Sequence, residues 1–155
     1  MKKKLCILLT VIALSLSMFS CQEVKYGHCE LILPLDADYR SAKDDGFDAV
    51  FTNGVYAVGI LRISFAAGFN QGISETLSAR ELAELWKAKT DKDVTVHTDE
   101  KTPYYFYFKD GYFYTNGFYR SPYAYFVVLL SAPEELYPEC FDGFIEILNG
   151  AIFEY

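Results

Sequence analysis

The sequence predicts an α+β fold in which an antiparallel β-sheet is covered by helices on both faces, as in an α/β/α sandwich. The run from 103 to 131, PYYFYFKDGYFYTNGFYRSPYAYFVVLLS, predicts three strands whose residues are apolar at both alternating positions. A sheet with one face in water alternates apolar with polar residues, so this sheet is expected to be covered on both faces. Helices are predicted at 77–89 and at about 138–148.

The first half of the chain predicts further strands. Residues 29–35, CELILPL, predict a strand that stops near Pro34, and residues 36–48 are polar and are expected to be irregular. Asn53-Gly54 lies between two β-rich runs, which is the sequence pattern of a tight hairpin. Glycine permits the positive φ that a type I′ turn requires.

The helix at 77–89 has a marked start. Ser78 and Glu81 have the spacing of a capping box, in which each side chain satisfies an amide that the helix leaves free. Apolar residues then recur at helical spacing and predict a buried face. These are Leu82, Leu85 and Trp86.

The second half of the chain is rich in strand and turn patterns. Residues 93–97 predict a short strand, Asp110-Gly111 predicts a tight turn, and Asn116-Gly117 predicts either another turn or a bulge. The last helix is expected from about 138 to 148, with Gly150 as the residue that ends it. Its apolar stripe comprises Phe141, Phe144, Ile145 and Leu148.

The N-terminus has the pattern of an export signal. Three lysines follow Met1, and residues 5–19 form an apolar run. Ser20-Cys21 then fits a lipoprotein signal, which predicts a signal peptide at 1–20, lipid attachment at Cys21, a short tether at 21–27 and a single domain at 28–155. Ordinary cleavage after Ser17, giving a secreted protein, is the alternative.

Lipidation of Cys21 would leave two cysteine thiols in the exported chain, those of Cys29 and Cys140. They form a candidate disulfide, because an exported protein meets oxidising conditions. Two separate buried thiols are the alternative.

The charge of the chain narrows the classes of partner. The formal net charge is −7, and without residues 1–20 the 14 basic residues fall to 11 against 21 acidic ones, a net charge of −10. An acidic chain without a basic patch disfavours nucleic acid as a partner. Association with the membrane is expected through the N-terminal lipid on the extracytoplasmic face.

The order of elements resembles that of the PsbP/DcrB-like superfamily. The stretches that carry the resemblance are ELILP, VYAVGILRIS, SARELAELW, YAYFVVLLS and FDGFIEIL. The resemblance implies an α/β/α sandwich around an antiparallel sheet. It also implies a role in binding or assisting other proteins, since the superfamily includes bacterial lipoproteins and photosystem accessory proteins. It supplies no shared catalytic motif.

The sequence offers no catalytic, metal or cofactor site. His28 and His97 are the only histidines, and neighbouring residues on a strand, such as His28 and Cys29, point to opposite faces. The motifs of common nucleophilic, zinc and phosphate sites do not occur. A small secreted hydrolase is the alternative function. A pocket that holds a carboxylate pair, or His97 beside Cys29, would indicate it.

Exposed aromatic residues are the candidate means of binding an unknown protein partner in the cell envelope. Most tyrosines between 104 and 125 are expected in the core, but those at strand ends are expected on the surface. Tyrosine combines an apolar body with a polar tip and is common at interfaces. The candidate partner-binding residues are Phe69, in the expected loop 66–72, with Tyr119 and Tyr123.

Overall fold

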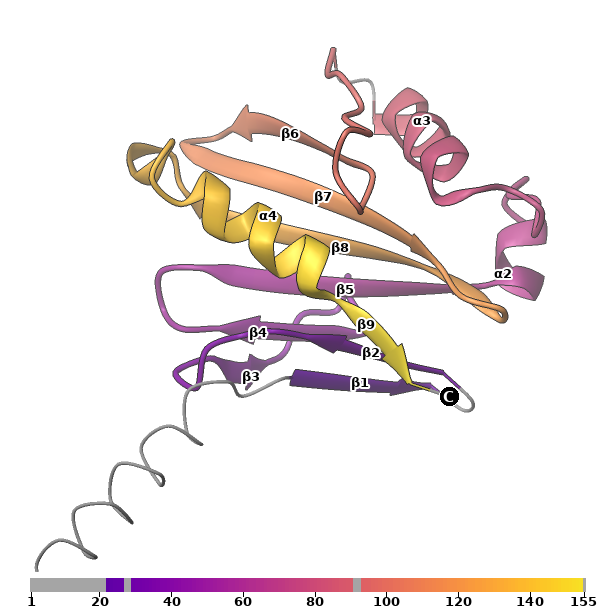
Figure 1. The fold of residues 1–155 in the computed structure, drawn as a ribbon, viewed down its shortest axis with the longest axis horizontal. Helices are drawn as coiled ribbons and strands as arrows, with labels where there is room; N and C mark the ends of the chain where they lie inside the picture. Colours follow the sequence, from indigo (N-terminus) through magenta and orange to yellow (C-terminus); the bar gives the residue numbers. More distant parts are fainter. Residues whose placement is uncertain (1–21, 27–28, 91–92, 155) are drawn as a thin grey trace, which may run out of the picture.

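The computed structural model describes residues 22–26, 29–90 and 93–154, which form two antiparallel sheets and three α-helices (Figure 1). The larger sheet has, in spatial order, the strands β3 (Arg40–Ala42), β4 (Ala49–Thr52), β5 (Ala57–Ser64), β8 (Ala124–Pro133), β7 (Tyr112–Arg120) and β6 (Tyr104–Lys109). The smaller sheet has the order β1 (Gln22–Tyr26), β2 (Cys29–Leu33) and β9 (Ile152–Glu154). The helices are α2 (Phe65–Phe69), α3 (Ala79–Thr90) and α4 (Phe141–Gly150), and a single 3₁₀ turn, η1 (Glu134–Leu136), precedes α4.

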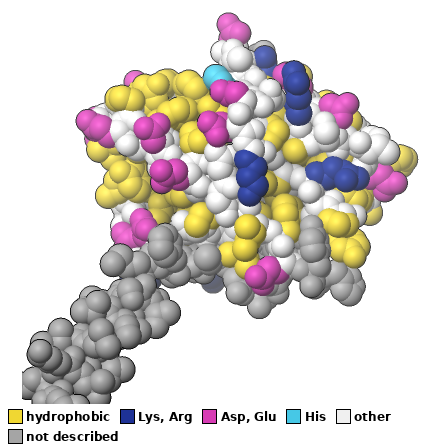
Figure 2. All heavy atoms as spheres, in the orientation of Figure 1, with side chains coloured by type: hydrophobic (Ala, Val, Ile, Leu, Met, Phe, Trp, Pro, Cys, Tyr) yellow, Lys and Arg dark blue, Asp and Glu magenta, His cyan; other side chains and the backbone are white. Residues whose placement is uncertain are grey.

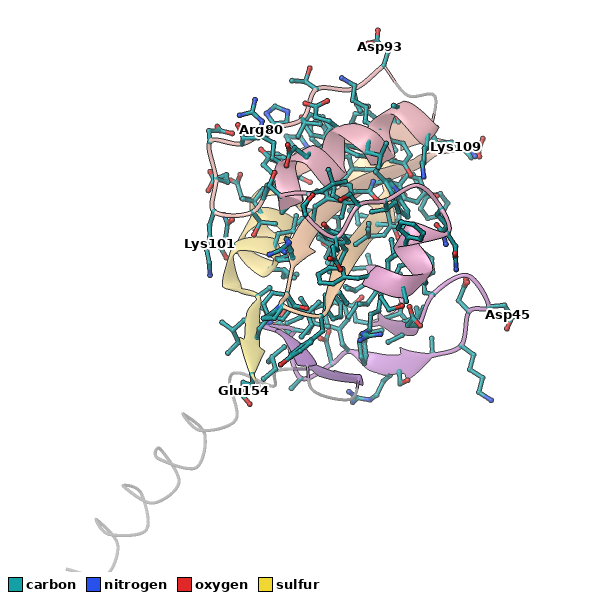
Figure 3. All side chains as sticks on the ribbon, turned by 90° about the vertical axis from the view of Figure 1, so that its right-hand side faces the viewer. Asp45, Arg80, Asp93, Lys101, Lys109 and Glu154 are labelled. Atoms are coloured by element: carbon teal, nitrogen blue, oxygen red, sulfur yellow. The ribbon has the colours of Figure 1, made fainter. Side chains whose placement is uncertain are left out.

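The larger sheet is covered on both faces, as predicted, so the fold class is confirmed. One face packs on α2 and α3 through a core that includes Phe118, Tyr125 and Leu82. The other face packs on α4 and on the smaller sheet, with Phe126 and Phe144 in its core. Figure 3 shows α4 and β9 on one side of the molecule and α2 on the other.

The start of α3 confirms the predicted capping box. The Ser78 hydroxyl oxygen accepts a hydrogen bond from the Glu81 amide at 3.2 Å, and the Glu81 carboxylate accepts one from the Ser78 amide at 2.8 Å. The Ser78 hydroxyl also donates to the Glu81 carboxylate at 2.7 Å, and the two bonds from the amide and hydroxyl of Ser78 stabilise the charged carboxylate and lower the pKa of Glu81. Leu82 is buried and Trp86 is half-buried against the sheet, so the apolar face of α3 is also confirmed.

The two predicted hairpins form, but with different turns. Asp110 and Gly111 join β6 to β7 with φ values of 53° and 78°, as a two-residue type I′ turn requires. The Asn53-Gly54 turn is longer, because Thr52 pairs with Ala57 and leaves four residues in the loop. The Asn53 side-chain oxygen holds that loop by accepting hydrogen bonds from two later backbone amides.

The prediction of a turn or bulge at Asn116-Gly117 is wrong. Both residues lie inside β7, where Asn116 pairs with Leu129 and Gly117 with Val128 of β8. Glycine at this position serves packing, because Leu148 of α4 occupies the space that a side chain on Gly117 would need.

The predicted strand at 93–97 is also wrong. Only His97 forms a β-bridge, with Tyr104, through backbone hydrogen bonds of 2.7 and 3.1 Å. Val94 and Val96 instead pack against the core beneath α3, so their alternation reflects the packing of an irregular segment.

Two segments that were expected to be irregular contain edge strands. Residues 22–26 of the predicted tether form β1, which pairs along its length with β2 and so belongs to the folded domain. The polar segment 36–48 contains β3, which pairs with β4. In both cases a neighbouring strand supplies hydrogen bonds that the local sequence does not reveal.

The C-terminal elements occur in the predicted order. The last helix begins at Phe141, and Gly150 is its final residue rather than the residue after its end. Phe144 is 2% exposed and stacks on Phe113 of β7, with 5.9 Å between ring centroids. The chain then continues into β9, which pairs with β2.

Candidate binding surface

The end of β5 leads directly into α2, a short helix that the sequence prediction left as a loop. The Ser64 hydroxyl oxygen accepts a hydrogen bond from the Ala67 amide at 3.2 Å and so caps the first turn. Serine one residue before Phe65 is a local feature that could have indicated this helix from the sequence.

The end of α2 turns the chain sharply and leaves Phe69 on the outside. The Ile73 amide donates to the Gly68 carbonyl at 2.8 Å and the Gly72 amide donates to the Phe69 carbonyl at 3.1 Å. This pair of bonds is a Schellman arrangement, and Gly72 supplies the positive φ, 75°, that it requires. Ile73 is 1% exposed and fills the core, whereas the Phe69 side chain is 79% exposed.

The segment after α2 is fixed to the sheet by side chains from β7 and β8. The Tyr125 hydroxyl lies 2.8 Å from the Ser74 carbonyl and 2.9 Å from the Leu77 carbonyl. Arg120 donates to the Glu75 carbonyl at 3.0 Å. A cavity of about 850 Å³ lies between α2 and this segment, and Phe69 is one of its walls.

Tyr123 lies at the same end of the molecule. It belongs to the turn between β7 and β8, whose amides at Tyr123 and Ala124 donate to the Ser121 hydroxyl at 3.1 and 3.0 Å. Ala124 pairs with Ser64, the residue that caps α2, so the turn and the helix are neighbours (Figure 1). The Tyr123 side chain is 50% exposed, as predicted.

The prediction that Tyr119 lies on the surface is wrong. Tyr119 is only 8% exposed, because it faces α4 and β9 from within β7. Its hydroxyl donates to the Leu148 carbonyl at 2.8 Å, and Phe153 packs edge-on against its ring. Burial raises the pKa of Tyr119 well above that of a free tyrosine. The candidate binding surface is therefore Phe69, Tyr123 and the cavity beside α2.

Of the two arrangements that would indicate a hydrolase, a pocket that holds carboxylates occurs beside α4, where Asp36, Glu139 and Glu146 line a cavity. His97 stacks on the rings of Tyr104 and Phe106, with centroid distances of 4.9 and 5.7 Å. The side chain of Cys29 lies outside the described residues. Within the described part of the chain, no three His, Cys, Asp or Glu side chains are grouped as metal ligands.

The predicted lipid attachment and disulfide are not decided by the structure. Cys21 and the signal peptide at 1–20 lie outside the described residues. Cys140 is buried and forms no disulfide with any described side chain, and burial raises the pKa of its thiol. Because the side chain of Cys29 is not described, the Cys29–Cys140 disulfide stays a prediction. None of the helices in the described part of the chain has the length and apolar character to cross a membrane.

Comparison with known proteins identifies the class of fold. No family model matches the sequence, and no curated protein matches it. Solved structures do match, and they confirm the PsbP/DcrB-like sandwich that the order of elements predicted. At 9–10% sequence identity this similarity establishes the fold and nothing further.

One similar structure is the cyanobacterial PsbP (CyanoP) from Synechocystis sp. PCC 6803, with a TM-score of 0.59 and 9% identity over 89% of this chain and 94% of that one. A protein from Bacteroides thetaiotaomicron VPI-5482 has a TM-score of 0.51 and 10% identity over 81% of this chain and 45% of its own. LpqN, involved in cell envelope biogenesis of Mycobacterium tuberculosis, has a TM-score of 0.49 and 10% identity over 88% of this chain and 92% of its own.

Proposed function

We propose that this protein is a noncatalytic accessory module of the cell envelope, anchored by a lipid on Cys21, that binds a protein partner through Phe69 and Tyr123. The observation that carries the proposal is the exposure of Phe69, at 79%, at the end of α2 and next to a segment that hydrogen bonds fix to the sheet. The anchor itself rests on the sequence of the export signal, which ends in Ser20-Cys21.

A large exposed ring on a fixed segment is suited to binding a protein. Aromatic anchors contribute much of the binding energy at protein interfaces, whereas charged residues at the rim contribute little. A backbone that is already held by hydrogen bonds loses little conformational freedom on association, which favours affinity. The cavity beside Phe69 would accept an apolar side chain of the partner.

The charge of the chain indicates the kind of partner. Without residues 1–20 the net charge is −10, which favours encounter with basic proteins and disfavours acidic ones. Association would therefore weaken as salt concentration rises, since salt screens exposed charges.

Affinity capture from native envelopes, with the full chain as bait, tests the binding surface. The double variant Phe69→Ala/Tyr123→Ala should lose the captured partner. The matched control is Phe108→Ala/Tyr112→Ala, which removes two rings that are 42% and 47% exposed near the β6–β7 turn. Both variants should keep the circular dichroism and melting temperature of the parent. Equal capture by the two variants would show that the proposed surface is wrong.

Mass spectrometry of the membrane fraction tests the anchor. A diacyl or triacyl modification is expected on Cys21, and Cys21→Ala should move the protein out of the membrane fraction. A mature chain that starts at Met18 would instead show ordinary cleavage and contradict the anchor, while leaving the binding surface to be judged by capture.

A further inference from the structure

A second cavity, of about 480 Å³, lies between α4 and the loop that follows β2. It is separate from the surface around Phe69, because α2 and α4 cover opposite faces of the larger sheet. Its volume falls within the range of about 300–1,000 Å³ that is usual for small-molecule sites.

Aromatic rings form the inner part of this cavity. Phe144 is 2% exposed, and the half-buried Tyr56 packs edge-on against it with ring centroids 5.7 Å apart. Tyr39, at 4% exposure, is the third ring. The face of an aromatic ring carries partial negative charge and attracts cations.

Carboxylates form the outer part of the cavity. Asp36 comes from the loop after β2, Glu139 lies just before α4, and Glu146 lies within α4. All three side chains are exposed. No lysine, arginine or histidine lines the cavity in the described part of the chain.

Two cationic side chains lie beside the cavity, and its three carboxylates outnumber them. Lys101 donates to the Asn149 carbonyl, at the end of α4, at 3.0 Å. Arg40 follows Tyr39 in the sequence, and its guanidinium donates to the carbonyls of Ala37 and Tyr39 at 2.7 and 2.9 Å. The N-terminal end of α4, at Phe141, carries a partial positive charge of about one half, which is small beside three carboxylates. Acidic side chains also gather over the α4 side of the face shown in Figure 2.

Tyr39 also lies in a negatively charged environment. Burial, together with the charges of Asp36 and Asp38, raises the pKa of Tyr39 to about 12. The phenol therefore stays neutral at physiological pH and presents an uncharged ring.

We propose that the cavity between α4 and the β2–β3 loop binds a small organic ammonium ion, with the rings of Tyr39, Tyr56 and Phe144 around its apolar part and the carboxylates of Asp36, Glu139 and Glu146 around its charge. Aromatic rings and carboxylates together favour a cation that has apolar surface over a metal ion, which prefers a full set of oxygen ligands.

Calorimetric titration with choline tests this site. The full chain, in an uncharged maltoside detergent, should bind choline in a saturable way and should not bind 3,3-dimethylbutan-1-ol, which has the same shape without the charge. Equal binding of the alcohol, or no binding of choline up to about 10 mM, would overturn the proposal.

Variants then locate the binding. Asp36→Asn and Glu146→Gln should each weaken choline binding by about fivefold, the effect of a unit charge about 4 Å away in water. Tyr56→Leu should also weaken it, through loss of a ring face. The control is Glu84→Gln, which removes an exposed carboxylate from α3 on the opposite face. Unchanged affinity in the three cavity variants, or an equal loss in the control, would show that the cavity is not the site.

Discussion

Gly117 of β7 lies against the side chain of Leu148 of α4, so closely that a Cβ on Gly117 would be 2.5 Å from Leu148 Cδ2. Leu148 is 1% exposed, and its carbonyl accepts hydrogen bonds from Tyr119 at 2.8 Å and Thr102 at 3.1 Å. The last turn of α4 is therefore held to the sheet by both packing and hydrogen bonds. This contact sets the position of α4, which forms one wall of the cavity described above.

Gly117→Ala should destabilise the fold by about 1–3 kcal/mol, the usual cost of an extra methyl group in a packed core. Leu148 is enclosed and has little room to move away. The matched control is Gly143→Ala in α4, where nothing lies within 4 Å of the new Cβ. That change should stabilise the helix by about 0.5–1 kcal/mol. Urea denaturation measures both, and a stable Gly117→Ala protein would mean that α4 is less closely packed than described.

Tyr119→Phe should lower the free energy of unfolding by about 0.5–1.5 kcal/mol, the net contribution of one buried hydrogen bond. The loss should lie toward the lower end of that range, because the Leu148 carbonyl keeps its bond from Thr102. The control is Tyr123→Phe, at a side chain that is 50% exposed, where little change is expected. Thermal denaturation compares the two, and equal shifts would argue against the buried bond.

Stability should fall as the pH rises above about 10, the ordinary pKa of tyrosine. Burial raises the pKa of Tyr39 to about 12 and also raises that of Tyr119. At a pH between the ordinary and the raised pKa, the tyrosine is deprotonated in the unfolded chain but not in the folded one, which favours unfolding. The stability that burial of the neutral tyrosine contributes is therefore fully present below pH 10 and is lost above it. Urea denaturation at pH 8, 10 and 11 measures the decline. Tyr39→Phe should make it shallower, whereas an unchanged slope would contradict the burial of Tyr39.

Phe144→Ala should destabilise the fold by about 3–5 kcal/mol, because the ring is only 2% exposed and packs on Phe113 of the sheet. Trp86→Ala should cost less, about 2 kcal/mol, since Trp86 is only half-buried on the opposite face. Both values follow from chemical denaturation monitored by far-ultraviolet circular dichroism. A loss below about 1 kcal/mol for Phe144 would mean that the apolar stripe of α4 does not face the sheet.

Features that depend on neighbouring residues in the chain were readable from the sequence. The capping box at Ser78 and Glu81 and the turn at Asp110-Gly111 form as predicted, because their hydrogen bonds and φ angles involve only a few consecutive residues. Apolar residues at both alternating positions of β8 likewise predicted a sheet buried on both faces. The exposure of Phe69 and Tyr123 was also predicted correctly.

The tertiary structure alone decided how distant segments meet. Asn116-Gly117 has the local pattern of a turn but continues a strand, because β8 supplies the hydrogen bonds and Leu148 needs the space. Tyr119 lies near the end of a strand, where exposure was predicted, but it is covered by β9, which lies more than 30 residues later in the sequence. Asp36 and Glu146 likewise line one cavity although they are far apart in the sequence. Burial and strand pairing depend on contacts between distant segments, which the local sequence does not specify.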